Sequence, residues 1–343
     1  MKKIKLKDKV TATIIDKVLK SLADGVVLIP TEYNYVFASN DQKRLLSLNQ
    51  TLAPFLTDSQ KMAPAKFLLK SDIDFDSLNE SAQKIISHFF PGPLIALLSH
   101  SGIRVTNSPL INSLLKRLAK PVYFIEKEDT DSVWLRKWED FIVLSVAAEI
   151  KKPILSTVVD LSVPIPTVVR KGAIPILEIE NLLGRRIKLS KDIYFSVLFV
   201  CTGNSCRSPM AKGILDKMLE KKNVLVYSAG TVAGIGSLPS EFAVRAVQKY
   251  GADISHHLSA SLTKELINGA DLILVMSPKH KESVVNLVSE AKSKTFLLKE
   301  YAFGSQEEVE DPIGAPLEVF EKVAAEINES LEKVAQDIKE RLN

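Results

Sequence analysis

The sequence predicts a two-domain α/β protein, and three observations lead to that prediction. The chain holds 343 residues, more than the ~100–200 residues common for a single domain. Short runs of β-branched and apolar residues alternate with segments whose apolar residues recur at helical spacing. A polar, charged segment at 184–192 (GRRIKLSKD) lies between two such alternating regions. We therefore expect one domain over residues 1–187 and a second over residues 193–343.

The first half alternates between strand-like and helix-like segments. Strands are predicted where short β-branched runs occur, at 25–30, 94–98, 121–125 and 154–161. Residues 81–90 show helical spacing of apolar residues, and the PGP segment at 91–93 predicts the end of that helix. Helices and strands that alternate in this way favour an α/β sheet.

The second half alternates more regularly. Strands are predicted at 195–200, 224–228, 271–276 and 294–298. Helices are predicted between and after them, at 209–221, 239–250, 279–288 and 317–342. This spacing predicts a doubly wound, parallel sheet of about four strands. Ligands of such sheets bind beyond the carboxyl ends of the strands, and one conspicuous loop directly follows the first strand.

Composition places few limits on the partner. Hydrophobic residues make up 46% and charged residues 25% of the chain, as in ordinary globular proteins. The net charge of +4 permits an anionic partner, although a solvated basic surface explains it as well. No apolar run approaches the ~18–20 residues of a membrane helix, and Asp16, Lys17 and Lys20 interrupt the apolar stretch near the N-terminus. We expect a cytoplasmic protein that does not contact membranes.

The chain has two cysteines, Cys201 and Cys206, and both lie in that loop. This excludes a disulfide framework, and it leaves a zinc site without enough ligands. We expect no metal and no other cofactor, and we expect thiol chemistry at the loop.

The loop reads Cys201-Thr202-Gly203-Asn204-Ser205-Cys206-Arg207-Ser208. Left-handed backbone angles at the Gly-Asn pair would turn successive N–H groups inward. Such a ring of amides at a helix N-terminus binds a phosphate dianion and favours a thiolate over a thiol.

Two side chains and one proline complete this loop. Arg207 can offer a bidentate fork to phosphate oxygens, and the Ser208 hydroxyl can donate to the cysteine sulfur. Pro209 suits the first turn of the following helix. A cysteine and an arginine at this spacing, taken alone, would be read as a buried strand end and a plain turn. The coincidence of all these features favours a phosphate-binding loop.

A phosphocysteine mechanism also needs a general acid that later activates water. Asp311 is the candidate, because Pro312 disfavours helix at this position and the loop precedes the last predicted helix. An Asp-Pro pair by itself more often marks the start of a helix.

Residues 195–343 resemble the low-molecular-weight protein phosphatases. The matching segments are VCTGNSCRSPMAKGIL at 200–215, YSAGT at 227–231, DISHHLSASLT at 253–263, ADLILVM at 270–276 and the Asp-Pro at 311–312. The resemblance implies a phosphorylated protein as substrate, Cys201 as nucleophile, Arg207 as phosphate clamp and Asp311 as acid and base. It implies a supporting set of hydrogen-bonding residues, namely Asn204, Ser208, Ser228 and His257. His256 and His280 are expected to be surface residues.

The substrate is either phosphoarginine or phosphotyrosine, and the sequence favours arginine. Tyrosine phosphatases of this family usually carry a bulky aliphatic residue where this loop has Ser205, and aromatic residues after the Asp-Pro, where this chain has Ile313-Gly314. The segment is closer to the bacterial protein-arginine phosphatases, which carry a Thr in the loop and Asp-Pro-aromatic-Gly after it. Ser205 keeps the hydroxyl of that Thr but lacks one methyl group, and Ile313 departs from that pattern because it stands in place of the aromatic residue. Acidic residues at 307, 308 and 310 could attract a guanidinium, or they could belong to a solvated loop.

Two further activities of this family concern its cysteines. Arsenate reductases of the family relay a disulfide through additional cysteines, which this chain lacks. Cys206 resembles the partner cysteine that can trap Cys201 as a reversible disulfide, although it could equally be a packing residue.

Residues ~12–180 resemble the YrdC-like threonylcarbamoyl-adenylate synthases, whose fold is a twisted α/β sheet. The matching segments are IPTEYNYVFAS at 29–39, FFPGPLIALL at 89–98, GIRV at 102–105, STVVD at 156–160 and RKGAIP at 170–175. Thr31, Arg104 and Ser156 keep the family's pocket residues.

Other parts of that pocket are altered. The Lys-x-Arg that holds nucleotide phosphates should fall near 49–51, where neither charge is present. The Ser-x-Asn falls at 126–128, where two glutamates would repel ATP. We expect synthase activity to be lost and the residual pocket to take a small anion or a nucleotide, with RNA a weaker candidate. The alternatives are a tRNA-modifying synthase with an appended phosphatase, and a binding protein without activity in either half.

Overall fold

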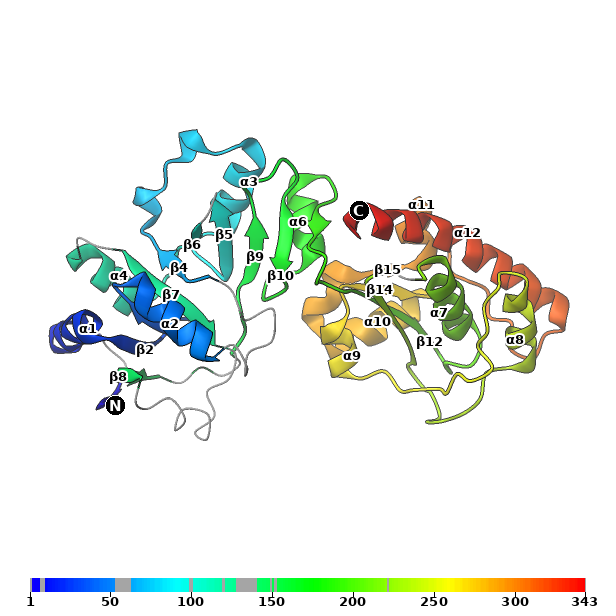
Figure 1. Ribbon diagram of the computed structural model, residues 1–343. Coiled ribbons are helices and arrows are strands. Elements are labelled where there is room, and N and C mark those ends of the chain that lie inside the picture. The colour runs from blue at the N-terminus through cyan, green and yellow to red at the C-terminus, as the bar shows by residue number, and fades with distance from the viewer. Residues whose placement is uncertain are drawn as a thin grey trace. The chain divides into compact units, whose positions relative to one another are not determined.

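The computed structural model describes residues 2–6, 10–52, 63–98, 101–118, 121–127, 141–148, 150, 153–220 and 222–342. The chain divides into two compact units, residues 1–187 and 188–343, each with its own sheet (Figure 1). No helix among the described residues has the length and apolar character needed to cross a bilayer.

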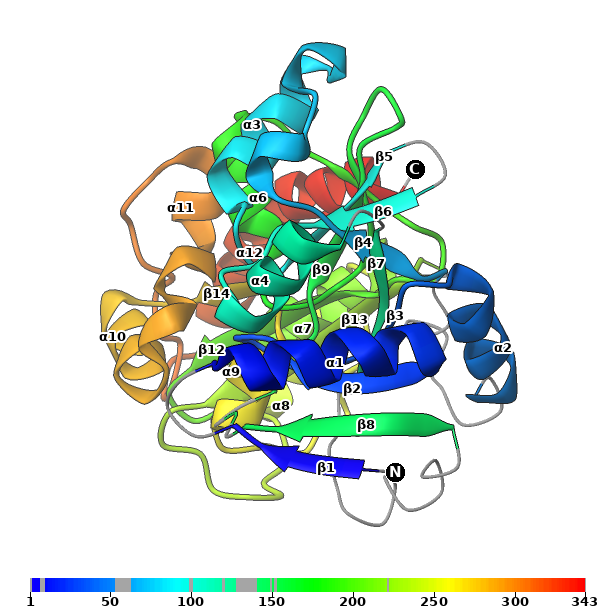
Figure 2. The same cartoon turned by 90° about the vertical axis from the view of Figure 1, so that its left-hand side faces the viewer.

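The first unit is a mixed α/β structure (Figure 2). Its strands are β1 (Lys2–Lys5), β2 (Val26–Pro30), β3 (Tyr35–Ser39), β4 (Ala65–Phe67), β5 (Leu94–Leu98), β6 (Ser101–Arg104), β7 (Val122–Lys127), β8 (Ile142–Ala147), β9 (Thr157–Asp160) and β10 (Thr167–Arg170). Its helices are α1 (Ala12–Asp24), α2 (Gln42–Leu52), α3 (Glu80–Phe89), α4 (Pro109–Arg117) and α6 (Ile176–Leu183), with 3-10 turns η3 (Lys70–Asp72) and η4 (Phe75–Ser77). The strands lie in the order β1-β8-β2-β3-β7-β4-β6-β5-β9-β10.

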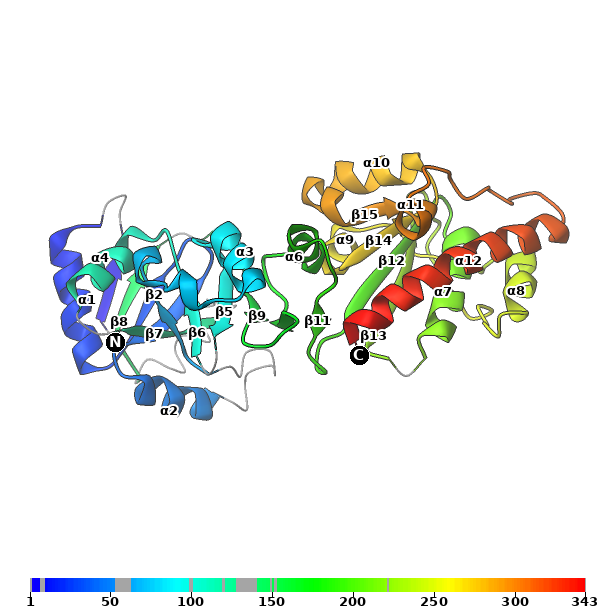
Figure 3. The same ribbon diagram turned by 90° about the horizontal axis from the view of Figure 1, so that it is seen from above.

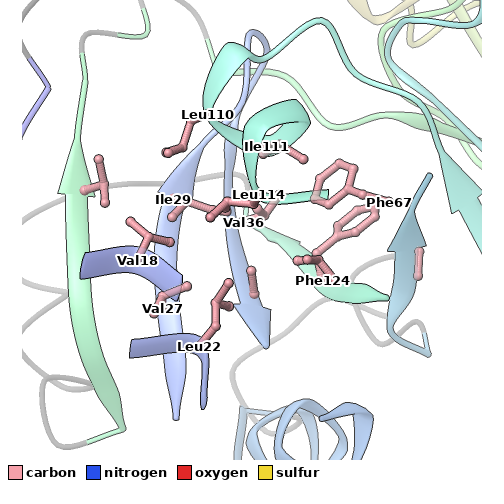
Figure 4. Packing of buried hydrophobic residues seen from close by; sticks show 14 of the residues in the cluster. Val18, Leu22, Val27, Ile29, Val36, Phe67, Leu110, Ile111, Leu114 and Phe124 are labelled. Carbon is pink, nitrogen blue, oxygen red and sulfur yellow. The ribbon is translucent and has the colours of Figure 1, made fainter. Parts of the chain in front are cut away.

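Strand β2 is buried on both faces. Because its side chains point alternately to the two faces of the sheet, the core of this unit has two parts, one on each face. Val27 and Ile29 pack beneath helices α1 and α4 (Figure 4). Val26 and Leu28 point to the other face, where Leu45 of α2 covers them. The five predicted elements of this half are present, with β9 beginning at Thr157, three residues later than predicted.

The second unit contains the four-stranded parallel sheet that the sequence predicted. Its strands are β12 (Phe195–Cys201), β13 (Val224–Gly230), β14 (Leu272–Val275) and β15 (Thr295–Leu297), in the order β13-β12-β14-β15, and the short strand β11 (Lys188–Leu189) precedes them. Its helices are α7 (Arg207–Met218), α8 (Glu241–Gln248), α9 (Lys264–Gly269), α10 (Pro278–Leu287), α11 (Leu298–Phe303) and α12 (Leu317–Leu342), with the 3-10 turn η5 (Ser289–Lys294).

Both faces of this sheet are covered, as a doubly wound fold requires. Helices α7, α8 and α12 lie together on one side of it, and α9 and α10 lie on the other (Figure 3). The central strand β12 is buried at every position, which explains why every residue of it except Ser196 is apolar. The carboxyl end of β12 therefore opens at the middle of the sheet edge, between β13 and β14.

Candidate functional site

The candidate site begins where β12 ends. Cys201 is the last residue of the strand and is 2% exposed, and Arg207 is the first residue of helix α7. The five residues between them form a tight loop against the neighbouring strand, because Cys201 pairs in register with Gly230 of β13. The loop thus lies at the buried N-terminus of helix α7, where backbone N–H groups and the helix dipole favour an anion.

Asn204 organises the loop. It has a left-handed φ of 53°, which costs energy for a residue other than glycine, and it is fully buried. Its side-chain amide donates to Ser208 Oγ at 2.9 Å and Ser228 Oγ at 3.0 Å, and its Oδ1 accepts from the Ala260 N–H at 2.9 Å. These bonds fix the strained conformation. The left-handed backbone was predicted for both Gly203 and Asn204, but Gly203 does not have a positive φ.

His257 supports the same turn from behind. Its Nε2 lies 2.9 Å from the backbone oxygen of Asn204 and must carry the proton, because a carbonyl oxygen only accepts. Burial lowers the pKa of His257, while the bond to the Asn204 carbonyl opposes this effect. The structure thus brings together the four supporting residues named from the sequence.

Two hydrogen-bond donors face the sulfur of Cys201. The Asn204 backbone N–H donates to Sγ at 3.3 Å, and Ser208 Oγ lies 2.9 Å from it. When the sulfur is a thiolate, the Ser208 hydroxyl is the donor. The second cysteine, Cys206, is buried and free, and burial raises the pKa of its thiol.

Arg207 and Asp311 meet across 104 positions of sequence. Arg207 Nη2 forms an ion pair with Asp311 Oδ2, and Nη1 donates to the Val309 carbonyl at 3.3 Å. The Arg207 side chain is 7% exposed, whereas that of Asp311 is 43% exposed. The predicted clamp and the predicted acid are therefore adjacent at the mouth of the loop. The Asp311 carboxylate holds the position on the Arg207 guanidinium that phosphate oxygens would take.

The two residues expected to select the substrate differ in their surroundings. Ser205 is half-buried, and its backbone oxygen accepts from the Ser240 N–H at 2.9 Å. Ile313 is 73% exposed, two residues beyond the acid, and Gly314 follows with a left-handed φ of 78°.

His280 was predicted to be a surface residue, and that prediction was wrong. Its side chain is 4% exposed in the first turn of α10, with Nε2 2.9 Å from Thr202 Oγ1 and Nδ1 3.0 Å from Ser277 Oγ. Burial, and then the charge of Arg207, lowers the pKa of His280 to about 4, although Asp311 opposes the shift. A neutral imidazole thus ties helix α10 to the loop. Its position just after β14, at the same sheet edge, was the signal that could have identified it. His256 is exposed, as predicted.

Gly230 is a second residue that sequence reasoning missed. A Cβ at this position would lie 2.5 Å from the backbone oxygen of Thr202 and 3.0 Å from the Asn204 nitrogen. Strand β13 can therefore approach the loop only because this residue has no side chain.

Among the described residues, the carboxylate of Glu126 occupies the residual pocket that was expected in the first unit. Thr31, Arg104 and Ser156 do come together, with Arg104 Nη2 donating to Thr31 Oγ1 at 3.4 Å. The carboxylate of Glu126 lies between them, accepting from Arg104 Nη1 at 2.8 Å and from Ser156 Oγ at 2.5 Å. Glu128, the other glutamate of that segment, and the side chain of Thr51 lie outside the described residues.

Comparison with known proteins concerns the second unit. Residues 196–343 match the family described as "Low molecular weight phosphotyrosine protein phosphatase". The protein-arginine-phosphatase of Bacillus subtilis (strain 168) is 38% identical over 146 residues, which are 42% of this chain and 96% of that protein. The protein-arginine-phosphatase of Geobacillus stearothermophilus is 38% identical over 144 residues, 42% of this chain and 96% of that protein.

A putative low molecular weight protein-tyrosine-phosphatase of Klebsiella pneumoniae is 34% identical over 147 residues, 43% of this chain and 99% of that protein. The family match leaves residues 1–195 uncovered. The chain spans nearly the whole length of these relatives, and the matched range contains the loop at 201–208 and Asp311. Through its second unit, the chain therefore belongs to the low-molecular-weight protein phosphatase family.

Proposed function

We propose that this protein phosphatase hydrolyses phosphoarginine side chains in proteins. The observation that carries the proposal is Gly314, which has a left-handed φ of 78° and no side chain, whereas tyrosine phosphatases of this family place aromatic residues after the Asp-Pro pair; Ile313 before it is 73% exposed. The next aromatic residue along the chain, Phe320, is 2% exposed and lies against Phe242 with ring centroids 5.7 Å apart. This segment therefore offers no ring to hold a phenol, while an aliphatic side chain can contact the flat face of a guanidinium.

Two further observations support arginine. The small, polar Ser205 leaves space where a bulky aliphatic residue would guide a phenyl ring. The two relatives named protein-arginine phosphatases are each 38% identical to this chain, and the relative named as a putative tyrosine phosphatase is 34% identical.

The first chemical step transfers phosphorus from nitrogen to sulfur. The phosphate enters the ring of loop amides, and Arg207 exchanges the Asp311 carboxylate for phosphate oxygens. The Cys201 thiolate attacks phosphorus, so that the P–S bond forms as the P–N bond breaks. Asp311, protonated for this step, gives its proton to the leaving nitrogen, and arginine departs as a guanidinium.

The second step hydrolyses the phosphocysteine. Asp311, now a carboxylate, accepts a proton from water as the water oxygen attacks phosphorus. The P–S bond breaks, which releases inorganic phosphate and restores the thiolate that Ser208 and Asn204 stabilise.

The test compares hydrolysis of a phosphoarginine peptide and a phosphotyrosine peptide of otherwise equal sequence, with Cys201→Ser as the blank. We expect a higher kcat/KM for phosphoarginine and no turnover by the variant. Faster hydrolysis of phosphotyrosine would reverse the substrate assignment and leave the enzyme class intact.

We also propose a cytoplasmic location, because a catalytic thiolate with a second cysteine five residues away requires a reducing environment. For the first unit we propose a YrdC-like fold without synthase activity. The family-like segments between residues 29 and 175 support the fold, and Glu126, whose carboxylate fills the pocket, supports the loss of activity.

A further inference from the structure

The first unit contains a sealed polar cluster, which we call the Glu126 cluster. Its members come from different strands and connections but share deep burial, each being at most 6% exposed: Thr31, Asn34, Arg104, Glu126, Ser156 and Arg170. Polar groups at this depth must find partners within the protein, because each unpaired one costs about 1–3 kcal/mol or more.

Five donor contacts converge on the carboxylate of Glu126. Oε1 accepts from Arg104 Nη1 at 2.8 Å, Asn34 Nδ2 at 2.9 Å and Ser156 Oγ at 2.5 Å. Oε2 accepts from the Ser156 backbone N–H at 3.1 Å and from Arg170 Nη2. Two guanidinium groups, an amide, a hydroxyl and a backbone N–H around two oxygens are the coordination that proteins give to a bound anion.

The guanidinium groups are themselves held from behind. Arg104 Nε donates to the Gly92 carbonyl at 3.3 Å, and Arg170 Nε donates to the Ser156 carbonyl at 3.1 Å. The arginines are thus aimed at the carboxylate by the backbone and would keep their positions without it. Such a preorganised arrangement is what distinguishes a binding site from an incidental ion pair.

The two buried arginines of the Glu126 cluster need an anion to balance their charge. The cluster holds two guanidinium groups and one carboxylate, so removal of the carboxylate leaves two buried cations without a counter-charge. Burial opposes ionisation of Glu126, but Arg170 and Arg104, with the bonds from Ser156 and Asn34, hold its pKa below the ordinary value. Glu126 is therefore an anion whenever the unit is folded near neutral pH.

Little space remains beside this carboxylate. The cavity that Glu126 and Arg170 line has a volume of about 20 Å³. That is the room of a single water molecule. Among the described residues, this cavity therefore has no room for a nucleotide or an organic acid beside Glu126 and Arg170.

We propose that the Glu126 cluster is an anion-binding site whose ligand is the protein's own Glu126 carboxylate. The site recognises a carboxylate through its two arginines, and a small monocarboxylate such as formate binds there when the glutamate side chain is shortened. The first unit is consequently closed to external anions at this position, and the cluster joins β6, β7 and β10 around an internal ligand. This inference does not depend on the phosphatase function of the second unit.

The test is chemical rescue of Glu126→Ala, followed by thermal unfolding of the full chain in sodium formate and in sodium chloride at equal ionic strength. We expect a lowered midpoint in chloride and a rise of about 2–5 °C in formate beyond that in chloride. Glu180→Ala is the matched control, since Glu180 is also buried but its partner Arg186 is 38% exposed and can be solvated without a ligand. Formate should not rescue this control.

Two outcomes would overturn the proposal. One is equal midpoints for Glu126→Ala in formate and chloride. The other concerns the wild-type protein and stands even if the variant does not fold: a rise of the first unit's midpoint in formate or inorganic phosphate would show that the arginines accept an external anion. Arg207→Ala removes the phosphate clamp of the second unit and ensures that any phosphate effect belongs to the first.

Discussion

Each unit of this protein has an arginine–carboxylate pair at its polar centre, and the two pairs behave differently because of exposure and support. Asp311 is 43% exposed, lies on a loop and contacts one arginine. Glu126 has a fully buried side chain, lies on a strand and contacts two. Water can replace Asp311 at Arg207 at little cost, whereas nothing described in the structure can replace Glu126. One pair is an exchangeable site and the other is a permanent one.

The largest expected effect is on stability. Glu126→Gln keeps the shape of the side chain but removes the charge between two buried guanidinium groups, and we expect it to lower the free energy of unfolding by about 3–5 kcal/mol. The matched Asp311→Asn should change it by less than about 1 kcal/mol, because that pair is partly solvated. Urea unfolding of both variants measures the difference, and similar values would remove the distinction between the pairs.

The same variant has a signature in pH. The pKa of Glu126 is lowered in the folded state, so its contribution is fully present above the ordinary value of 4.5 and is lost as the pH falls through the folded pKa. Wild-type stability should therefore decline on acidification below about 4.5, and Glu126→Gln should lack this part of the decline. If stability fell with acidification in Glu126→Gln as it does in the wild type, Glu126 would not be the ionised group responsible.

The next effect is on catalysis. Arg207→Lys replaces a bidentate fork by a point charge, and we expect kcat/KM to fall about 10²–10³-fold on the phosphoarginine peptide. Arg170→Lys makes the same change at the permanent pair and should leave kcat/KM unaltered while lowering the midpoint of thermal unfolding. Loss of activity in Arg170→Lys would mean that the buried pair communicates with the phosphatase site.

A smaller effect is expected at His280, which positions the loop through Thr202. His280→Ala and Thr202→Val should each lower kcat/KM about 10-fold. The double variant should be no worse than either, because both substitutions remove the same hydrogen bond. Additive losses would show that the two residues act independently.

The pH dependence of His280 follows from its pKa of about 4, against 6.5 for a free imidazole. Between these values the unfolded chain binds a proton that the folded protein does not, so stability falls as the pH drops from 6.5 to about 4. His280→Asn should flatten this part of the stability profile. The wild-type pH–rate profile should show no ionisation of His280 between about pH 5 and 8.

The smallest expected effect is on phosphate binding at the exchangeable pair, Arg207 and Asp311. Asp311→Asn frees Arg207 from a competing carboxylate and should tighten binding of inorganic phosphate about fivefold, equivalent to about 1 kcal/mol. Isothermal titration of phosphate into both proteins measures this. Weaker binding by the variant would show that Asp311 supports the ground-state anion and does not compete with it.

Much of the phosphatase site could be predicted because it is nearly continuous in the sequence. Strand, loop and helix follow one another over residues 195–218, so the chemistry of the loop depends on local backbone angles and on one apolar run. Asp311 was identified through its proline and its place before α12. The parallel sheet was predictable because buried strands alternate with amphipathic helices at regular spacing.

Other parts of the site depend on how the strands pair and were not predicted. His280 looks like one of several polar residues on a helix, and only the pairing of β14 beside β12 brings it to Thr202. Gly230 looks like an ordinary strand end until its register with Cys201 is known. The left-handed turn occurs at Asn204 and not at Gly203, because the side chain of Asn204 finds partners on β13 and beyond.

The sequence by itself predicted the elements, the course of the loop at 201–208 and the class of chemistry, since these rest on local periodicity and on residues that are neighbours in the chain. Only the tertiary structure decided what the carboxylates do. Glu126 lies 22 residues from Arg104 and 44 from Arg170, and Asp311 lies 104 residues from Arg207. Strand register and burial bring these charges together and determine which pair water can reach, and neither property can be read from residue types along the chain.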